Sequence, residues 1–379
     1  MKIAVFKERR DGERRVAATP ETVKKFIQLG FEVAVETGAG ISSSIPDQAF
    51  KEAGAKIART AKDAARGADL VLKVQGPSMT EINSIPKGAI LVAILKPHAE
   101  METIKALARA GVTACAMELM PRISRAQGMD VLSSQSNLAG YKAVLDAAAE
   151  YGRVFPMMMT AAGTVAPAKV MVMGAGVAGL QAIATARRLG AIVSATDVRI
   201  AAKEQVESLG AKFVMVEDDE TKDAETAAGY AREMSKAYQK KQAKLIAETI
   251  KKQDIVITTA LIPGRPAPVL ITKEMVKTMK PGSVIVDLAV EMGGNCEASK
   301  PGQVVELGGV RIVGHLNVPS RLAADASALY AKNLYNFVAL LVDQETKKLK
   351  IDWQDEIIAG VALSHGGKLV HADYKGGNK

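Results

Sequence analysis

Cysteine, histidine and aromatic residues are scarce in this sequence. The chain has two cysteines, Cys115 and Cys296, and four histidines among 379 residues. Two cysteines cannot build a disulfide framework, and neither has neighbours spaced like metal ligands, so we expect a reduced, cytoplasmic protein without a bound metal. Aromatic residues make up 4% of the chain, which argues against a stacking surface for nucleic acid. No apolar stretch reaches the roughly 20 residues that span a bilayer, and the N-terminus lacks a long apolar signal region.

An excess of basic residues gives the chain a net charge of +9. Such a balance suits nucleic acid, an anionic membrane face or an acidic partner. Because the lysines and arginines are scattered along the chain, we interpret them as a solvated basic surface. Contact with a membrane-bound partner is the alternative. The length of the chain predicts two or three domains.

Segment 170–180 is the most informative stretch, because a short apolar strand runs into glycines with GxGxxG spacing. Gly174 allows a tight turn, Gly176 lets a pyrophosphate approach the backbone, and Gly179 lets the following helix pack against the sheet. A lone fingerprint is weak evidence, but a strand, a turn, a helix and a second strand at 192–195 all agree here. We expect a dinucleotide to lie against Gly174, Gly176, Val177, Ala178 and Gly179.

Asp197 follows the second strand, 18 residues after Gly179, near the spacing of a carboxylate that binds the adenosine ribose. Its charge would repel a 2′-phosphate, so the sequence favours NAD over NADP. Arg199 keeps NADP open, because an arginine could accept that phosphate. We place Asp197, Val198 and Arg199 in the cofactor site.

Strand and helix signals alternate along the chain. The predicted strands are 2–6, 32–36, 69–73, 89–94, 112–116, 192–195, 212–216, 254–259, 283–287 and 310–313. The predicted helices are 20–29, 47–53, 101–110, 138–151, 203–209, 231–252 and 322–345. This alternation predicts an α/β fold of two Rossmann-like, doubly wound domains with parallel sheets, separated by a cleft and joined by long crossing helices. The first domain, 1–136 plus 322–379, lacks the fingerprint, and the second, 137–321, is the NAD-binding domain.

Several segments leave their roles open. The acidic stretch 217–230 predicts an exposed loop that could act as a lid, and Tyr230 either anchors the next helix or closes over nucleotide. Leu261 and Asp287 follow predicted strands at the edge where ligands bind, although Asp287 could equally cap a loop. The methionines of 157–159 favour core packing over a binding surface.

A second polar constellation occupies 118–137. Arg122 and Asp130 lie eight residues apart and can pair. Gln127 can donate to a carboxamide, and Ser133 adds a hydroxyl. The residues alone leave two interpretations: a functional loop at the mouth of the cleft, or a polar interdomain loop whose charges satisfy each other.

The chain resembles the NAD(H)-binding component of the proton-translocating NAD(P) transhydrogenase family. The resemblance covers essentially the whole chain, and its most specific motifs are 120–127, 130–141, 157–164, 176–185 and 258–264. The wider family includes alanine dehydrogenase, whose N-terminal region has a motif similar to residues 15–20.

This resemblance implies roles for individual residues. Arg122 would contact the nicotinamide region and pair with Asp130. Gln127 would bridge toward the partner nucleotide, and Ser133 would hold the carboxamide. The insertion bearing Tyr230 would close over NAD(H). The remaining nucleotide contacts would come from Gly229, Tyr230, Gln242, Ala260 and Leu261.

The resemblance also implies an activity: hydride transfer between NADH and NADP+ bound on a partner domain, coupled to proton translocation by a separate membrane component. The chain would form a homodimer and associate peripherally with the inner membrane through NADP-binding and membrane-spanning subunits. One alternative is an alanine dehydrogenase, in which Lys73 and Arg15 would hold a 2-oxo acid, although His98 is out of register for its catalytic histidine. The other is a non-enzymatic NAD sensor.

Overall fold

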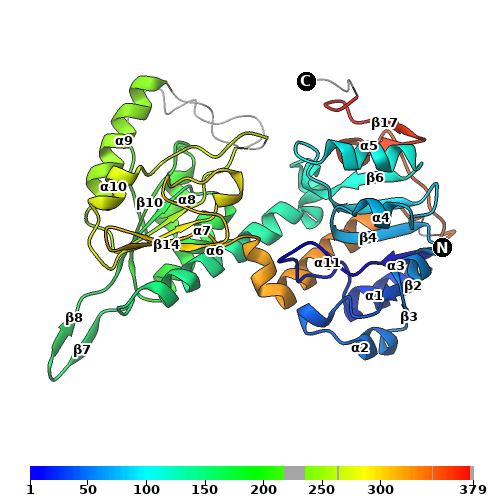
Figure 1. Cartoon of the computed structure of the whole chain (residues 1–379), viewed down its shortest axis with the longest axis horizontal. Helices are drawn as coiled ribbons and strands as arrows, with labels where there is room; N and C mark the ends of the chain where they lie inside the picture. The colour runs from blue at the N-terminus through cyan, green and yellow to red at the C-terminus, as the bar shows by residue number, and fades with distance from the viewer. Residues whose placement is uncertain (217–234, 263, 344, 376–379) are drawn as a thin grey trace. The chain divides into compact units, whose positions relative to one another are not determined.

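The computed structural model describes residues 1–216, 235–262, 264–343 and 345–375 (Figure 1). Contacts divide the chain into two compact units, one made of Met1–Gln135 with Ser320–Lys379 and the other of Ser136–Pro319. The divisions predicted from the sequence fall after residues 136 and 321. No helix within the described ranges is long and apolar enough to cross a membrane.

Unit 1 contains an eight-stranded sheet in the order β17-β16-β6-β5-β4-β1-β2-β3. The strands are β1 (Lys2–Val5), β2 (Glu32–Glu36), β3 (Lys56–Ala58), β4 (Leu70–Gln75), β5 (Ile90–Ile94), β6 (Thr113–Ala116), β16 (Ala362–His365) and β17 (Lys368–Leu369). Strands β1 to β6 are parallel, whereas β16 and β17 extend the sheet antiparallel. Strand order reverses beside β1, as in a doubly wound sheet.

Helices cover both faces of this sheet. They are α1 (Pro20–Gln28), α2 (Asp47–Glu52), α3 (Ala61–Ala65), α4 (Met79–Ile82), α5 (Met101–Arg109), α11 (Ala323–Leu340) and α12 (Glu356–Val361). Helix α1 begins as predicted, because the Thr19 side chain accepts from the N–H of Thr22 and Pro20 takes the first position. Helix α11 ends earlier than residue 345, since Asp343 closes a turn by accepting from the N–H of Thr346.

Unit 2 contains a seven-stranded sheet in the order β11-β10-β9-β12-β13-β15-β14. The strands are β9 (Lys169–Met173), β10 (Ile192–Thr196), β11 (Lys212–Phe213), β12 (Ile255–Thr258), β13 (Val284–Asp287), β14 (Val304–Leu307) and β15 (Val310–Val313). Its helices are α7 (Val177–Arg188), α8 (Ala202–Ser208), α9 (Lys236–Ile250) and α10 (Lys273–Lys277). All strands are parallel except β14. The predicted α/β class is therefore confirmed, with antiparallel strands added at sheet edges.

Helix α6 (Val131–Glu150) begins well before the predicted start at residue 138. The carboxylate of Asp130 caps it by accepting from the N–H of Ser133 at 2.9 Å. Segment 131–137, interpreted from the sequence as loop, is therefore the first two turns of this helix. The division between the two units also falls inside it.

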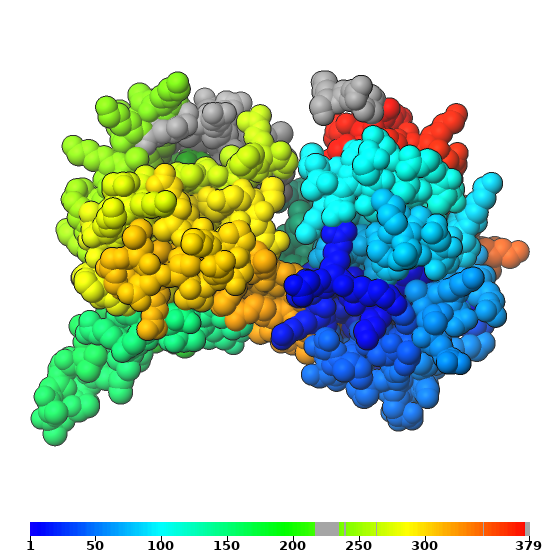
Figure 2. Space-filling view, in the orientation of Figure 1, coloured from blue at the N-terminus to red at the C-terminus, as the bar shows by residue number. Residues whose placement is uncertain are grey.

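The methionines of 157–159 are exposed, so the prediction that they pack in a core is wrong. Met157, Met158 and Met159 are 61%, 44% and 77% exposed. They lie on or next to a two-stranded antiparallel hairpin of β7 (Met158–Thr160) and β8 (Gly163–Val165). This hairpin joins neither large sheet and projects from the rest of its unit (Figure 2), so its methionine side chains are exposed among the described residues.

Candidate nucleotide-binding site

The glycine-rich turn lies where strand order reverses in unit 2, between β9 and α7. Gly174 has φ +103°, and a Cβ there would lie 2.6 Å from Oγ1 of Thr259. A Cβ on Gly179 would lie 1.8 Å from the carbonyl oxygen of Gly174. Gly176 is different, because a Cβ there would meet nothing within 4 Å. Two of the glycines are thus required by packing, and the third faces open space.

The N-terminus of α7 is open to a ligand. Gly176 is its N-cap residue and supplies no side-chain cap, and Val177 is 40% exposed. Ala178 is half-buried in the same turn. The first N–H groups of a helix have no intrahelical partner and carry partial positive charge. This end of α7 therefore suits a phosphate group.

Asp197, directly after β10, is buried against the glycine-rich turn. Its Oδ2 accepts from the N–H of Ala175 at 2.7 Å, which ties β10 to the turn after β9. Arg199 binds the same carboxylate through its Nε and Nη2 atoms, both at 2.9 Å. Val198 between them is half-buried and packs against Tyr238. The structure thus brings the fingerprint glycines and Asp197 together.

The loop after β12 adjoins the same turn, since Oγ1 of Thr259 donates to the carbonyl of Gly174 at 3.0 Å. Ala260 is half-buried and Leu261 is 48% exposed. Asn295, fully buried, fixes this loop. Its Oδ1 accepts from the N–H of Ala260 at 3.0 Å, and its Nδ2 donates to the carbonyl of Ala260 at 2.9 Å. Asn295 was not among the predicted site residues, although its place after the predicted strand 283–287 could have indicated a site-adjacent residue.

Asp287 has a structural role, which decides between its two interpretations. Its carboxylate accepts from Oγ1 of Thr258, from Oγ of Ser299 and from the N–H groups of Ala289 and Cys296. All four donors belong to the strand ends and the loop that follows β13. Asp287 therefore caps this loop.

Gln242 on α9 is buried behind the end of β10. Its Nε2 donates to Oγ1 of Thr196 at 2.8 Å, and its Oε1 accepts from the N–H of Val216 at 3.3 Å. Tyr238, one turn earlier, is 1% exposed, and the sequence analysis did not single it out. Gly229 and Tyr230, with the predicted lid, lie outside the described residues.

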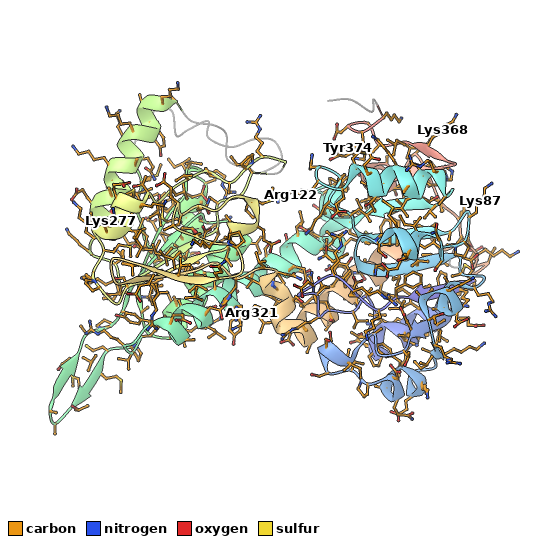
Figure 3. The ribbon with its side chains drawn as sticks, in the orientation of Figure 1. Lys87, Arg122, Lys277, Arg321, Lys368 and Tyr374 are labelled. Atoms are coloured by element: carbon orange, nitrogen blue, oxygen red, sulfur yellow. The ribbon has the colours of Figure 1, made fainter. Side chains whose placement is uncertain are left out.

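The polar constellation of unit 1 follows β6. Arg122 is exposed (Figure 3) and precedes the 3-10 helix Ser124–Met129, on which Gln127 is also exposed. Helix α11 fixes this segment, because Nδ2 of Asn333 and Nδ2 of Asn336 both donate to the carbonyl of Gly128, at 2.9 and 2.7 Å.

The two residues at the start of α6 are half-buried and contact each other. Besides its backbone bond, Ser133 donates from Oγ to Oδ2 of Asp130 at 2.5 Å. This pair caps the helix, and it fixes both side chains at the end of the exposed segment that carries Gln127.

Arg125, the second arginine of the segment, has a structural role. Its guanidinium binds both carboxylate oxygens of Asp355, at 2.6 and 2.9 Å, and so fixes the segment to the start of α12. Arg122 is the arginine of this segment to which the family resemblance assigns a role in the site.

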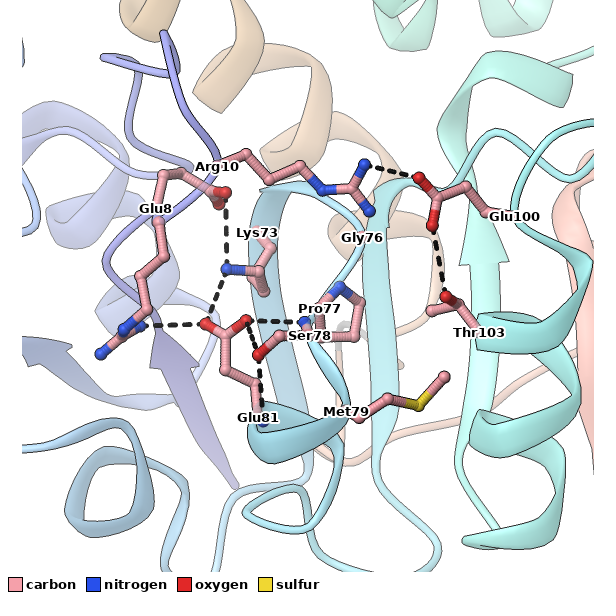
Figure 4. A pocket seen from close by; sticks show the side chains of 11 residues that line it. Glu8, Arg10, Lys73, Gly76, Pro77, Ser78, Met79, Glu81, Glu100 and Thr103 are labelled. Atoms are coloured by element: carbon pink, nitrogen blue, oxygen red, sulfur yellow. Dashed lines mark hydrogen bonds and ion pairs between the residues drawn. The ribbon is translucent and has the colours of Figure 1, made fainter.

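A cavity of about 400 Å³ lies at the carboxyl ends of β1 and β4 in unit 1 (Figure 4). The ammonium group of Lys73, 1% exposed, lies 3.1 Å from Glu81 and 3.4 Å from Glu8. Burial raises the pKa of Glu8 even though Lys73 acts to lower it. Lys73 is thus already ion-paired within its own unit.

Arg15, the other cation that would hold a 2-oxo acid in an alanine dehydrogenase, also binds side chains of its own unit. It forms a buried ion pair with Glu13 at 2.6 Å and donates to Oε1 of Gln135 at 2.8 Å. His98 contacts Tyr374, whose hydroxyl lies 3.0 Å from Nε2 of the imidazole. Among the described residues, no group of three or more histidine, cysteine, aspartate or glutamate side chains could hold a metal ion.

Comparisons with known proteins agree with this architecture. The family model of the alanine dehydrogenase/PNT N-terminal domain matches residues 4–139, and that of the C-terminal domain matches residues 143–372. The chain is 60% identical over 376 residues to an NAD(P) transhydrogenase alpha subunit chain of Rhodospirillum rubrum, covering 98% of each chain.

Solved structures give the same result. A transhydrogenase from Sinorhizobium meliloti is 59% identical, with a TM-score of 0.89 and coverage of 98% of this chain and 100% of that one. An L-alanine dehydrogenase is 28% identical, with a TM-score of 0.82 and coverage of 98% of each chain. The resemblance stated from the sequence is thereby confirmed. The chain belongs to the alanine dehydrogenase/PNT family, and within it to the NAD(P) transhydrogenase alpha subunits.

Proposed function

We propose that this chain is the NAD(H)-binding subunit of a proton-translocating transhydrogenase, and that unit 2 is its NAD-binding domain. It exchanges hydride between NADH and NADP+ bound on a partner domain, and a separate membrane component couples the exchange to proton flow. The observation that carries the proposal is the open N-terminus of α7 beside Gly176, with Asp197 next to it. This pairing of a phosphate site with a ribose carboxylate suits a dinucleotide.

The adenosine half would be held by unit 2. The pyrophosphate would bind the first N–H groups of α7, next to Val177, Ala178 and Gly179. Asp197 would accept from the ribose hydroxyls, which favours NAD over NADP because a 2′-phosphate would meet a carboxylate. Further contacts would come from Val198, Gly229, Tyr230, Gln242, Ala260 and Leu261, and Arg199 lies in the same site through its bonds to Asp197.

By the family resemblance, the nicotinamide would be oriented by Arg122, Gln127, Asp130 and Ser133. Arg122 and Gln127 are exposed on a segment that α11 fixes at Gly128. Asp130 and Ser133 are fixed to each other at the start of α6. When bound, the nicotinamide supplies or accepts the hydride. The protein's task is to orient the ring so that the donor and acceptor carbons come within about 3–3.5 Å.

The partners and the assembly follow from the family. We propose an NADP-binding subunit and a membrane-spanning subunit as partners, with this chain on the cytoplasmic side of the inner membrane. We also propose a homodimer. Its support is the hairpin of β7 and β8, because exposed methionines adapt readily to a protein surface.

One assay tests the activity against its alternatives. The purified chain should oxidise NADH with an NADP analogue only when an NADP-binding partner domain is added, since one fingerprint supplies one dinucleotide site. NADH oxidation with pyruvate and ammonium by the isolated chain would instead support an alanine dehydrogenase. NADH binding without turnover in either assay would support a sensor.

A substitution then tests the site. Gln127→Asn should slow hydride transfer strongly while leaving NADH affinity nearly intact, because it would misplace the nicotinamide ring and not the adenosine. Equal losses of NADH binding and of transfer in this variant would contradict the role proposed for Gln127.

A further inference from the structure

The carboxylate of Asp197 is fully occupied by donors of its own unit. Its Oδ1 accepts from the backbone N–H of Arg199 at 2.8 Å and from Nε of Arg199 at 2.9 Å. Its Oδ2 accepts from the N–H of Ala175 at 2.7 Å and from Nη2 of Arg199 at 2.9 Å. A carboxylate offers about four lone-pair positions. These four bonds therefore leave no position for another donor.

A ribose diol at this place needs two acceptor positions, one for each hydroxyl. Two of the four existing bonds come from the backbone, at Ala175 in the glycine-rich turn and at Arg199 itself, and neither can leave without a change of backbone conformation. The other two come from the guanidinium of Arg199, which a side-chain rotation can remove. The Arg199 side chain is 18% exposed against 7% for Asp197, so water already reaches the group that has to move.

We propose that the guanidinium of Arg199 is an internal competitor of the adenosine ribose. It occupies Asp197 in this structure and is displaced when a diol binds. This inference rests on the proposed function, because it assumes that Asp197 receives the ribose of NAD(H). Its consequence is specific: part of the free energy of nucleotide binding is used in breaking the Arg199–Asp197 pair, so Arg199 lowers the affinity for NADH.

Calorimetric titration of Arg199 variants with NADH tests whether Arg199 lowers the affinity for NADH. Arg199→Gln should bind NADH about fivefold more tightly than the wild type, the size of one partly exposed ion pair. Arg199→Lys should fall between them, because an ammonium group cannot fork across both carboxylate oxygens. Tighter binding would support the competition, since removing a cation should by itself weaken the binding of the anionic NADH.

The matched control is Arg311→Gln. Arg311 also pairs with a carboxylate of unit 2, Glu150 at 3.3 Å, but it lies near the amino ends of the strands, opposite the glycine-rich turn. The NADH affinity of the Arg311→Gln variant should equal that of the wild type. A gain in this variant as large as in Arg199→Gln would overturn the inference, because the effect would then be one of net charge.

A second pair of ligands tests whether the competition is for the diol. The gain in Arg199→Gln should appear with ADP and be absent with 2′,3′-dideoxyadenosine diphosphate, which has no hydroxyls to offer. Equal gains with both ligands, or no gain with NADH, would overturn the inference. Failure of the wild type and of every variant to bind NADH would instead count against the proposed function.

Discussion

Asn295 holds the backbone of Ala260 by both of its hydrogen-bonding groups. The amide oxygen of Asn295 accepts from the N–H of Ala260 at 3.0 Å, and the amide nitrogen donates to its carbonyl at 2.9 Å. The same nitrogen donates to the carbonyl of Pro268 at 2.8 Å. One buried side chain thus fixes the loop after β12 beside the glycine-rich turn, although it need not touch the nucleotide.

The first prediction follows from this pair. Asn295→Asp keeps one acceptor but removes the donor to two carbonyls and buries a charge, so it should lower the free energy of unfolding by about 2–3 kcal/mol. It should also weaken NADH binding, since the Ala260–Leu261 loop loses its support. Denaturant melts and calorimetry measure both effects. Asn83→Asp, at an exposed position of unit 1, is the control and should change neither.

Alanine substitutions at two glycines of the turn should have different effects, one on folding and the other on NADH binding. Gly179→Ala places a Cβ 1.8 Å from the carbonyl of Gly174, so we expect a loss of stability of more than about 4 kcal/mol or no folded protein. Gly176→Ala places a Cβ in open space and should cost only about 1 kcal/mol. It should nevertheless weaken NADH binding, because the Cβ stands where the pyrophosphate approaches. A folded Gly176→Ala protein with wild-type affinity would contradict the phosphate site.

Nucleotide choice should follow Asp197. The wild type should bind NADH far more tightly than NADPH, and Asp197→Asn should narrow this difference by about tenfold, the effect of about 1.4 kcal/mol. The physical reason is charge: the amide no longer repels a 2′-phosphate, and it frees Arg199 from its ion pair. Calorimetry with both nucleotides makes the comparison. Equal affinities in the wild type would contradict the assignment of Asp197.

The buried Glu13–Arg15 pair should give unit 1 an acid-dependent stability. Burial acts to raise the pKa of Glu13, but hydrogen bonds and charge from Arg15, with help from Gln75, lower it from 4.5 to about 2. Because the folded pKa lies below the unfolded one, the stabilisation is complete above pH 4.5 and disappears as the pH falls toward 2.

Glu13→Gln tests this dependence. At neutral pH it should lower the free energy of unfolding by about 3 kcal/mol, because it removes the negative charge that the buried guanidinium of Arg15 binds. Melting curves between pH 7 and pH 2 should show the difference from the wild type shrinking below pH 4.5. Glu21→Gln, at an exposed partner of Lys25, serves as the control. A difference that stays constant over this range would contradict the ion-pair explanation.

The sequence by itself determined the elements that depend on neighbouring residues. Thr19 and Pro20 start α1, Gly174 turns the chain after β9, and Asp197 follows β10 at the spacing of a ribose carboxylate. These features need only the local backbone and the steric demands of a few adjacent side chains. Strand alternation likewise indicated two α/β units, because each strand has to be covered by the helices that follow it.

Tertiary structure alone decided which polar groups meet and which apolar groups are covered. Asn295 reaches Ala260 across 35 positions of the chain, and its place after a predicted strand indicates a site-adjacent residue but not this partner. The methionines of 157–159 are apolar enough for a core, yet in the part of the chain that the structure describes they are exposed, on or next to a projecting hairpin. Arg199 is two residues from Asp197, but only the structure shows that its guanidinium binds that carboxylate. Composition sets what a side chain can do, and the positions of distant elements determine whether it has a partner.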